Sequence, residues 1–406
     1  MFDTRPEFAE VEIGVAILGP TIDSGDSIRA TWAEVDLGAL RRNFQLIRNS
    51  VGSAGVMLIA KANAYGHGLV EVARALSGLA DCVGVAVLEE GILLRREGID
   101  APILVLGGVW GDQIPYFIKH NLILTASSVD RLSQIDSAAG AAGRRASVHL
   151  KIDTGLERVG VHYFNAHKLQ EAALKCANVD VLGIYSHFAN ADAQDLTHTK
   201  LQLERFQEVL AFYEKMSIKR PTAHMANSAA ILRLPESHFD MVRPGLLLYG
   251  VSPSQHAPMS IGVTPALSWK SRVVYFKVVP PDHPVSYGST WKSSRPVRVV
   301  TIPVGYGDGY MRAMSNSAQV IINNRKYQQV GNVCMDQMMV NIESDSAYNG
   351  DEAILLGSSG DERITVEDLA AWANTIPNEI LTSINTRVPR VYTCKAELEK
   401  DKHRIG

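Results

Sequence analysis

The sequence predicts an α/β protein: a (β/α)8 TIM-like barrel followed by a mostly β C-terminal domain. Eight short apolar segments recur between about residues 56 and 250, and segments with helical periodicity alternate with them. After about residue 265 the pattern changes to short strands separated by turn residues. Alternating strands and helices favour a parallel sheet, and eight such units favour a closed barrel, with an open doubly wound sheet as the alternative.

The expected barrel strands are apolar on both faces and rich in β-branched residues, which is typical of buried parallel strands. They are 56–60, 82–87, 102–107, 122–127, 147–153, 179–188, 222–227 and 242–250. We therefore divide the chain into a non-helical N-terminal extension (1–28), the barrel (29–265) and the C-terminal domain (266–406).

Helical spacing of apolar residues marks segments 37–51, 69–79 and 199–216 within the barrel. The expected buried face of the third segment consists of Leu201, Leu203, Phe206, Leu210 and Phe212. In the C-terminal domain we expect strands near 271–279, 296–305, 319–324, 338–342 and 352–357. One helix is expected there, over 365–376, with Thr365 as its N-cap.

Composition and charge restrict the classes of partner. The chain has 406 residues, 46% hydrophobic and 20% charged, with a formal net charge of -3. It has no basic stripe for nucleic acid, and its apolar runs are shorter than the roughly 18 residues of a membrane span. The N-terminal segment is acidic where a secretory signal is basic, so we expect a cytoplasmic protein. Four scattered cysteines indicate neither a disulfide framework nor a metal site.

Unusual polar residues lie at the ends of the expected barrel strands, where the active sites of barrels collect, and one more lies near the start of the eighth strand. They are Lys61, Lys151, Asp153, Arg158, His187, Asn227, Ser228 and Arg243. A single lysine or histidine at such a place is usually solvated or structural, but the coincidence of several indicates a functional site. A buried lysine suits a Schiff base, and Gly245 with the Asn227–Ser228 pair could hold a phosphate. This combination suggests pyridoxal phosphate, although sites for sugar phosphates have a similar composition.

Ten motifs between about residues 30 and 395 then resemble one family. They are "TWAEVDLGALRRNF", "AKANAYGHG", "KIDTGLERVG", "YSHFANAD", "HMANSAA", "VRPGLLLYG", "VSYGSTW", "IPVGYGDGY", "VGNVCMDQ" and "RVPRVY". In this order they resemble the bacterial alanine racemases, which are barrel-type (fold-type III) pyridoxal phosphate enzymes. The resemblance implies a homodimer with shared active sites that interconverts L- and D-alanine and supplies D-alanine for peptidoglycan.

The resemblance also implies roles for residues that bind the cofactor. Lys61 would form the Schiff base with pyridoxal phosphate, and Arg243 would donate a hydrogen bond to the pyridine nitrogen. His187 would lie near the ring. The remaining cofactor-binding residues, mostly at the phosphate, would be Tyr65, Asn227, Ser228, Gly245 and Leu246.

Further implied roles concern the substrate and the second base. Arg158 would contact the ring oxygen and the substrate carboxylate, and Met335 would bind that carboxylate through its backbone. Tyr287 would be the second base, reaching the barrel mouth of the other subunit. Lys151 matches a lysine that is often carbamylated in this family and would hold Arg158. Tyr306 and Asp336 lie in matching motifs and would support the site.

Two bases explain racemisation simply, because the Cα proton leaves one face and returns to the other. By the resemblance, Lys61 serves the D-isomer and Tyr287 the L-isomer. Arginine only donates, so a ring nitrogen facing Arg243 stays unprotonated. The ring is then a weaker electron sink, which suppresses transamination at some cost in rate.

One departure from the family pattern is Thr386, which stands where a tyrosine usually contacts the phosphate. We expect a roomier pocket, so the closest rival function is that of a broader alanine/serine racemase. Glu157, beside Arg158, is expected to point outward. A barrel-type amino-acid decarboxylase is less favoured, because "SYGST" and "CMDQ" argue against it. A barrel-only pyridoxal phosphate carrier is less favoured, because such proteins lack the β domain and the second base expected here.

Overall fold

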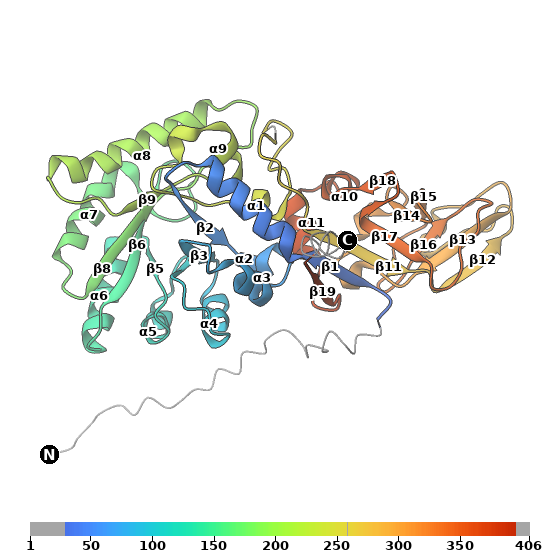
Figure 1. Ribbon diagram of the computed structural model, residues 1–406, viewed down its shortest axis with the longest axis horizontal. Helices are drawn as coiled ribbons and strands as arrows, with labels where there is room; N and C mark the ends of the chain where they lie inside the picture. The colour runs from blue at the N-terminus through green and yellow to red at the C-terminus, as the bar shows by residue number, and fades with distance from the viewer. Residues whose placement is uncertain (1–28, 258, 395–406) are drawn as a thin grey trace, which may run out of the picture.

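The computed structural model describes residues 29–257 and 259–394. The predicted extension, 1–28, therefore lies outside the described residues. Figure 1 shows the parallel strands with their covering helices on one side and a second, mostly antiparallel sheet on the other. None of the helices in the described ranges is long and apolar enough to cross a membrane.

The predicted barrel is confirmed, because all eight strands pair in parallel around it. They are β2 (Gly55–Ile59), β3 (Cys82–Val85), β4 (Ile103–Val105), β5 (Leu124–Ala126), β6 (Ala146–Asp153), β8 (Val179–Tyr185), β9 (Thr222–His224) and β10 (Met241–Val242). Strand β10 pairs with both β2 and β9. A single bridge between Leu104 and Ile123 joins β4 to β5 and completes the ring.

The eighth strand is much shorter than the predicted 242–250. It ends at Val242, and Leu246–Tyr249 form a 3-10 helix, η4. Pro244 lacks the N–H that a ladder needs, so the apolar run that follows cannot continue the parallel pairing. The short strand β7 (Val161–His162) pairs with the end of β6.

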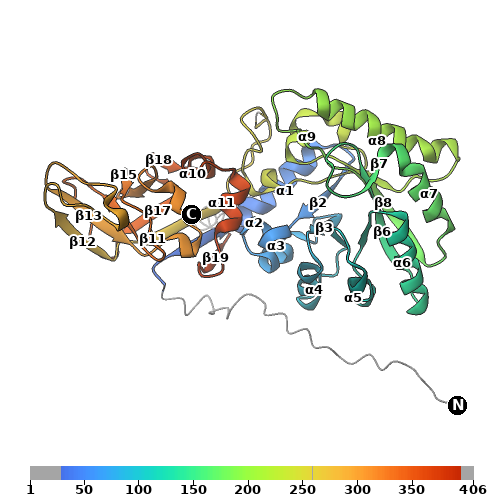
Figure 2. The same ribbon diagram turned by 180° about the vertical axis from the view of Figure 1, so that it is seen from behind.

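Helices cover the outside of the barrel, as Figures 1 and 2 show. They are α1 (Leu37–Ser50), α3 (Leu69–Leu76), α4 (Leu88–Arg96), α5 (Ile114–Lys119), α6 (Val129–Ala141), α7 (Ala166–Lys175), α8 (Thr197–Lys215) and α9 (Ser228–Arg233). Helix α1 begins after Asp36, whose carboxylate accepts from the N–H of Ala39 as an N-cap.

The predicted face of α8 is partly wrong. Leu203 and Phe206 are buried, but Leu201 is 40% exposed and the polar Gln202 is fully buried. The Gln202 side chain accepts from the N–H of Ala189 at 2.9 Å and donates to the carbonyl of His187 at 3.1 Å. Burial of Gln202 is therefore compensated by hydrogen bonds that hold the segment after β8.

The second sheet contains a strand from the N-terminal part of the described chain. Strand β1 (Trp32–Asp36) pairs antiparallel with β11 (Leu267–Arg272) and parallel with β19 (Arg390–Thr393). The boundary at residue 29 assigned this segment to the barrel, and the pairing corrects that assignment. The other strands are β12 (Tyr275–Val279), β13 (Val297–Ile302), β14 (Gln319–Ile322), β15 (Arg325–Val330), β16 (Met338–Asn341), β17 (Glu352–Ser359) and β18 (Glu362–Ile364).

Within the described residues, two α-helices accompany this sheet rather than the one predicted. Helix α10 (Val366–Ala373) has the predicted cap, with the Thr365 hydroxyl accepting from Asp368 N–H at 3.1 Å. Helix α11 (Pro377–Ser383) begins with proline at its first position, a favourable start that the sequence analysis overlooked. Its residue Asn378 lines the cavity described below.

Asn43 on α1 joins the helix to the segment that leads from the barrel to the second sheet. Its side-chain amide donates to the carbonyls of Leu248 (3.0 Å) and Thr264 (2.8 Å) and accepts from Thr264 N–H (2.9 Å). Asn43 is buried, so its loss leaves backbone groups unpaired away from water.

We expect Asn43→Ala to lower the free energy of unfolding by about 3 kcal/mol, because each unpaired buried group costs roughly 1–3 kcal/mol. Urea unfolding of the purified protein measures this change. Gln45→Ala is the matched control, since Gln45 lies on the same helix and bonds only to the exposed Asn49 in the described structure. Equal losses in the two variants would contradict the structural role of Asn43.

Candidate active site

A cavity of about 560 Å³ opens at the C-terminal ends of the barrel strands, and we call it the barrel-mouth cavity. The predicted site residues that line it are Lys61, Tyr65, Lys151, Arg158, His187, Asn227, Ser228, Arg243, Gly245 and Leu246. The barrel thus brings together side chains that the sequence separates by up to about 180 positions.

Lys61 lies at the start of an unusual turn. After β2, the segment Lys61–Tyr65 (α2) has positive φ at four consecutive non-glycine residues, between 52° and 54° from Ala62 to Tyr65. This conformation is strained for L-residues and persists only where neighbours hold it. Glu90 accepts from Ala62 N–H at 2.6 Å, and the Asn63 side chain accepts from Leu69 N–H at 2.8 Å. The turn carries Lys61 and Tyr65 to the same cavity.

The electrostatics of the barrel-mouth cavity favour a neutral amine on Lys61. Burial lowers the pKa of Lys61, and the positive charges of Arg158 and Arg243 lower it further, against a smaller opposite effect of Glu90. A neutral amine is nucleophilic, whereas the ammonium form is not. Lys61 therefore has the environment of a reactive lysine.

Tyr65, Ser228 and Gly245 form a small cradle at one side of the cavity. The Ser228 hydroxyl accepts from Gly245 N–H at 2.8 Å and from Leu247 N–H at 3.2 Å. Burial raises the pKa of Tyr65 to about 12, so its hydroxyl keeps its proton and can donate. The Tyr65 ring stacks on Tyr249 at 4.9 Å between ring centroids, which fixes its position.

Arg243 lies at the cavity floor in a chain of buried side chains. Its Nη1 bonds to Nδ1 of His224 at 2.7 Å, and its Nη2 donates to the carbonyls of Ser186 (2.7 Å) and Met225 (3.0 Å). Nη2 also lies 3.1 Å from Nδ1 of His187. Burial lowers the pKa of Arg243 to about 10, so it stays cationic near neutral pH. These bonds in the described structure do not use its Nε–H.

Lys151 is buried at the end of β6, beneath the cavity. Its ammonium donates to the carbonyl of Ile152 at 3.0 Å and lies 4.9 Å from the centroid of the Tyr185 ring. Burial lowers the pKa of Lys151 to about 7, with Arg243 as the next cause. The neighbouring Asp153 accepts from Arg158 N–H at 3.1 Å, and Arg158 itself lines the cavity.

The predicted site residues of the C-terminal domain lie elsewhere. Tyr287, Tyr306 and Met335 are exposed and line no part of the barrel-mouth cavity. They share one region, because Asn332 donates to the carbonyl of Tyr287 at 2.7 Å and Tyr306 N–H donates to the carbonyl of Cys334 at 3.1 Å. An exposed apolar cluster of this kind is typical of an interaction surface.

Three other residues singled out in the sequence are also solvent-facing. Asp336 pairs with Arg387 at 2.7 Å. Thr386 is exposed and does not line the barrel-mouth cavity, so this structure places no phosphate contact at that position. Glu157 is exposed, as expected, and pairs with His162 at 2.8 Å. The four cysteines, all within the described ranges, are unpaired.

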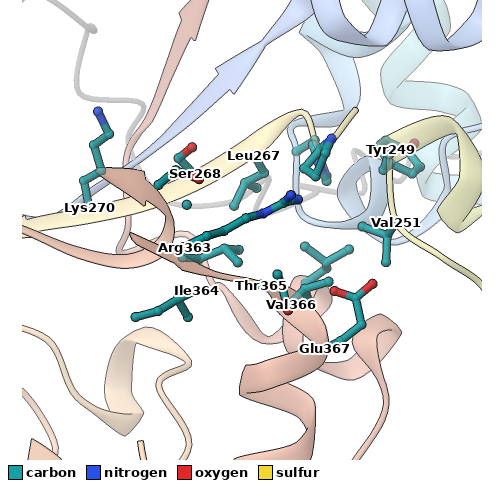
Figure 3. A pocket seen from close by; sticks show the side chains of 17 residues that line it. Tyr249, Val251, Leu267, Ser268, Lys270, Arg363, Ile364, Thr365, Val366 and Glu367 are labelled. Carbon is teal, nitrogen blue, oxygen red and sulfur yellow. The ribbon is translucent and has the colours of Figure 1, made fainter. Parts of the chain in front are cut away.

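A second cavity, of about 360 Å³, lies at the junction of the two sheets (Figure 3). Tyr249, Leu267 and Arg363 are among its lining residues, and Figure 3 shows the Arg363 side chain extending across it. None of the predicted site residues line this cavity, and its lysine, Lys270, is paired with the carboxylates of Glu34 and Glu352. The barrel-mouth cavity is therefore the candidate active site.

Family models match almost the whole described chain. The model described as "Alanine racemase, N-terminal domain" matches residues 35–253, and "Alanine racemase, C-terminal domain" matches residues 266–392. The chain belongs to the alanine racemase family. Its activity is that of the family, a pyridoxal phosphate-dependent isomerisation of alanine.

Individual alanine racemases resemble the chain along nearly their whole length. The enzyme of Carboxydothermus hydrogenoformans is 45% identical over 90% of this chain and 100% of its own. That of Symbiobacterium thermophilum is 41% identical over 90% of this chain and 98% of its own. The solved alanine racemase of Streptomyces coelicolor A3(2) has a TM-score of 0.86 and 36% identity, with 91% of this chain and 99% of that chain covered.

The residues of the barrel-mouth cavity fit the cofactor of the alanine racemase family. The lowered pKa of Lys61 favours the amine form that would react with an aldehyde. The Nε–H of Arg243, which the bonds above do not use, suits an acceptor such as a ring nitrogen. A Cβ on Gly245 would lie 2.6 Å from the Tyr65 hydroxyl, so a side chain here would fill the cradle. Glycine keeps that space open for a phosphate beside two hydroxyl groups and backbone N–H groups.

Sequence reasoning missed some residues of this alanine racemase site. His224 and His149 are buried behind Arg243, and Asn378 of α11 lines the cavity from the second domain. His224 ends strand β9 beside the polar pair Asn227–Ser228, which was a usable signal. His149 and Asn378 carried none, since their contacts depend on the closed barrel and on domain packing.

Proposed function

We propose that Lys61 holds pyridoxal phosphate and that this chain, as a cytoplasmic homodimer, supplies D-alanine for peptidoglycan. The observation that supports the proposal most is Lys61 itself. It is a half-buried lysine whose pKa is lowered by burial, Arg158 and Arg243, and it lines the same cavity as the Gly245 cradle. Tyr65, Ser228 and the backbone of Gly245 and Leu246 would bind the phosphate. Asn227 would support this cradle by capping α9, since its side chain accepts from Ala230 N–H at 3.0 Å.

Pyridoxal phosphate, when bound, supplies an electron-withdrawing ring that acidifies the Cα hydrogen of alanine. Arg243 would donate to the ring nitrogen and keep it unprotonated, because an arginine cannot accept. His187 would pack near the ring. Burial and the neighbouring cations lower the pKa of His187 far below its usual value, so it stays neutral there. Arg158 would bind the substrate carboxylate.

Two residues would move the Cα proton. The Lys61 Nζ would take or return it on the face of the D-isomer, and the Tyr287 Oη on the face of the L-isomer. Bases on opposite faces remove the need for one group to cross the substrate.

Tyr287 would act in the barrel-mouth cavity of the other subunit. Its side chain is 74% exposed in a single chain, next to the exposed Met335 and Tyr306. Met335 would bind the substrate carboxylate through its backbone, with Tyr306 and Asp336 as supporting residues. Each active site would then need two copies of the chain.

Lys151 would be carbamylated and would hold Arg158 through the resulting negative charge. The pKa of Lys151 is lowered to about 7, so the neutral amine that reacts with carbon dioxide is populated above that pH and protonated below it. In bicarbonate at about pH 8, native mass spectrometry should show one carbon dioxide added per chain. At about pH 6 this mass should be lost, and Lys151→Arg should never show it. An unmodified chain at both pH values would contradict carbamylation.

A coupled assay with L-alanine, D-alanine and L-serine tests the proposed substrate. We expect turnover of both alanine isomers to exceed that of serine. The departure from the family pattern at Thr386 is the reason to test a broader alanine/serine racemase, and any effect of its smaller size would be indirect, since Thr386 does not line the barrel-mouth cavity of a single chain. Serine turnover equal to that of alanine, reduced in Thr386→Tyr, would favour this second function.

A further inference from the structure

Three buried side chains at three barrel strands form a hydrogen-bonded chain that ends at Arg243. His149 lies on β6, His224 ends β9, and Arg243 follows β10. Nδ1 of His149 lies 2.8 Å from Nε2 of His224, and Nδ1 of His224 lies 2.7 Å from Nη1 of Arg243. All three side chains are at least 95% buried. We propose that His149 is a positioning residue that fixes the tautomer of His224 and thereby the orientation of Arg243.

The donor at each step follows from Arg243. A guanidinium only donates, so Nδ1 of His224 must accept and carries no proton. Burial and the charge of Arg243 lower the pKa of His224 far below its usual value, so the ring is neutral. Its single proton is therefore on Nε2 and points to His149. Nδ1 of His149 therefore accepts the hydrogen bond from Nε2–H of His224. The single proton of the neutral His149 ring is then on Nε2 of His149.

The opposite tautomer of His224 would place two donors face to face across the 2.7 Å contact. Arg243 would then have to turn away from His224, and its other bonds to Ser186 and Met225 would change with it. The acceptor Nδ1 of His149 disfavours this opposite tautomer, because it can form a hydrogen bond only with the Nε2–H tautomer of His224. A hydrogen bond that fixes a histidine tautomer from behind is a general device of protein sites.

The backbone around His149 is built to accommodate its ring. The register between β6 and β8 shifts between Val148 and His149, and Gly183 lies opposite His149. A Cβ on Gly183 would lie 2.5 Å from both Cε1 and Nδ1 of His149, closer than any real contact. Gly183 does not have a positive φ, so the backbone itself does not require glycine there. The space for the His149 ring does require it.

The described ring contacts of His149 are with Tyr185 and His224. The Tyr185 ring packs edge-on to it at 6.4 Å and stacks on His224 at 4.8 Å. Burial lowers the pKa of His149 to about 3, so it too stays neutral and can accept at Nδ1. The Tyr185 hydroxyl bonds to Thr125 at 2.8 Å and to the carbonyl of Leu106 at 3.2 Å. Arg243 lies over the Tyr185 ring, with its Cζ 5.4 Å from the ring centroid. His149 is thus the group that faces Nε2 of His224.

The direct test is the tautomer of His224 in the wild-type holoenzyme, measured by NMR of protein with 15N-labelled histidine. We expect a protonated Nε2 and an unprotonated Nδ1 on His224, assigned by comparison with His224→Gln. Protonation of Nδ1 would overturn the inference. This readout does not use racemase activity, so it can fail while the proposed function holds. The functional consequence rests on the proposed role of Arg243 at the ring nitrogen. The tautomer measurement can agree with the inference even if that role of Arg243 is disproved.

Two substitutions then separate hydrogen bonding from packing. His149→Gln keeps an acceptor for His224 Nε2–H, whereas His149→Leu fills similar space without one. We expect His149→Leu to lower kcat by roughly 10-fold to 100-fold, the range for loss of such outer partners, with KM for alanine little changed. We expect His149→Gln to retain most of kcat and the wild-type tautomer. Equal kcat in the two variants would overturn the positioning role.

Gly183→Ala is an independent test of the positioning role, because the added methyl group would displace the His149 ring without changing Arg243. It should reproduce the kcat loss of His149→Leu, with Gly78→Ala as the control, since a Cβ there meets no atom within 4 Å. Wild-type kcat in a folded Gly183→Ala enzyme would contradict the inference. Should Gly183→Ala fail to fold, the His149 pair and the wild-type tautomer still decide it.

Discussion

Replacement of Lys61 by alanine is expected to lower kcat by roughly ten-thousandfold or more in both directions. The substitution removes a base, and such groups contribute roughly 10²–10⁴-fold, and it also removes the amine that would attach the cofactor. The visible absorbance of the attached cofactor should disappear as well, leaving that of free pyridoxal phosphate. Racemase kinetics and an absorbance spectrum of the purified protein measure both effects.

Lys61→Arg separates nucleophilicity from charge. Arginine keeps a positive charge at this position but never presents a neutral amine. We therefore expect Lys61→Arg to be as inactive as Lys61→Ala. Lys175→Ala is the control, since Lys175 is an exposed lysine in the last turn of α7. Activity of Lys61→Arg near that of the wild type would mean that Lys61 serves only through its charge.

Tyr287→Phe is expected to produce an asymmetric loss. Exchange of the Cα hydrogen with solvent deuterium should fall by roughly 10²–10⁴-fold when L-alanine is supplied, because the L-face base is removed. Exchange from D-alanine should persist, since Lys61 still serves that face. Proton NMR of each isomer in deuterated buffer measures the two rates separately.

The control for this substitution is Tyr348→Phe. Tyr348 is 62% exposed on the same domain and lies in none of the family motifs, so exchange from both isomers should remain at the wild-type rate. Equal residual exchange from L- and D-alanine in Tyr287→Phe would show that Tyr287 is not specific for one face. The thermal stability of Tyr287→Phe chains should be unchanged, because the side chain makes little contact within its own chain.

The barrel was predictable because its strands are local signals. Each buried parallel strand is a short run of apolar residues, and the alternation with helices is visible in the sequence. The polar residues that end these strands were predictable for the same reason. Lys61 and Arg158 could therefore be assigned to one end of the barrel from the sequence alone. Arg243 was expected near the start of the eighth strand, and it follows that strand only because the strand ends at Val242.

Other features depend on contacts between distant segments. Strand β1 pairs with β11 and β19. The five residues of β1 contain no sequence pattern that identifies either of these partner strands. The left-handed turn after Lys61 includes Ala62 and Ala64, which have no intrinsic preference for positive φ. Glu90 and Leu69, from later in the chain, stabilise this turn. Tertiary contacts override local preference at this reactive position, as expected for a functional site.

The central claim is that Lys61 of one chain and Tyr287 of another complete each active site. Mixing and refolding equal amounts of Lys61→Ala and Tyr287→Phe chains tests it most directly. In mixed dimers, one of the two sites combines an intact Lys61 with an intact Tyr287. Since about half of randomly assembled dimers are mixed, activity should return to about one quarter of wild type. If the mixture stays as inactive as its components, the two bases do not meet across a subunit interface.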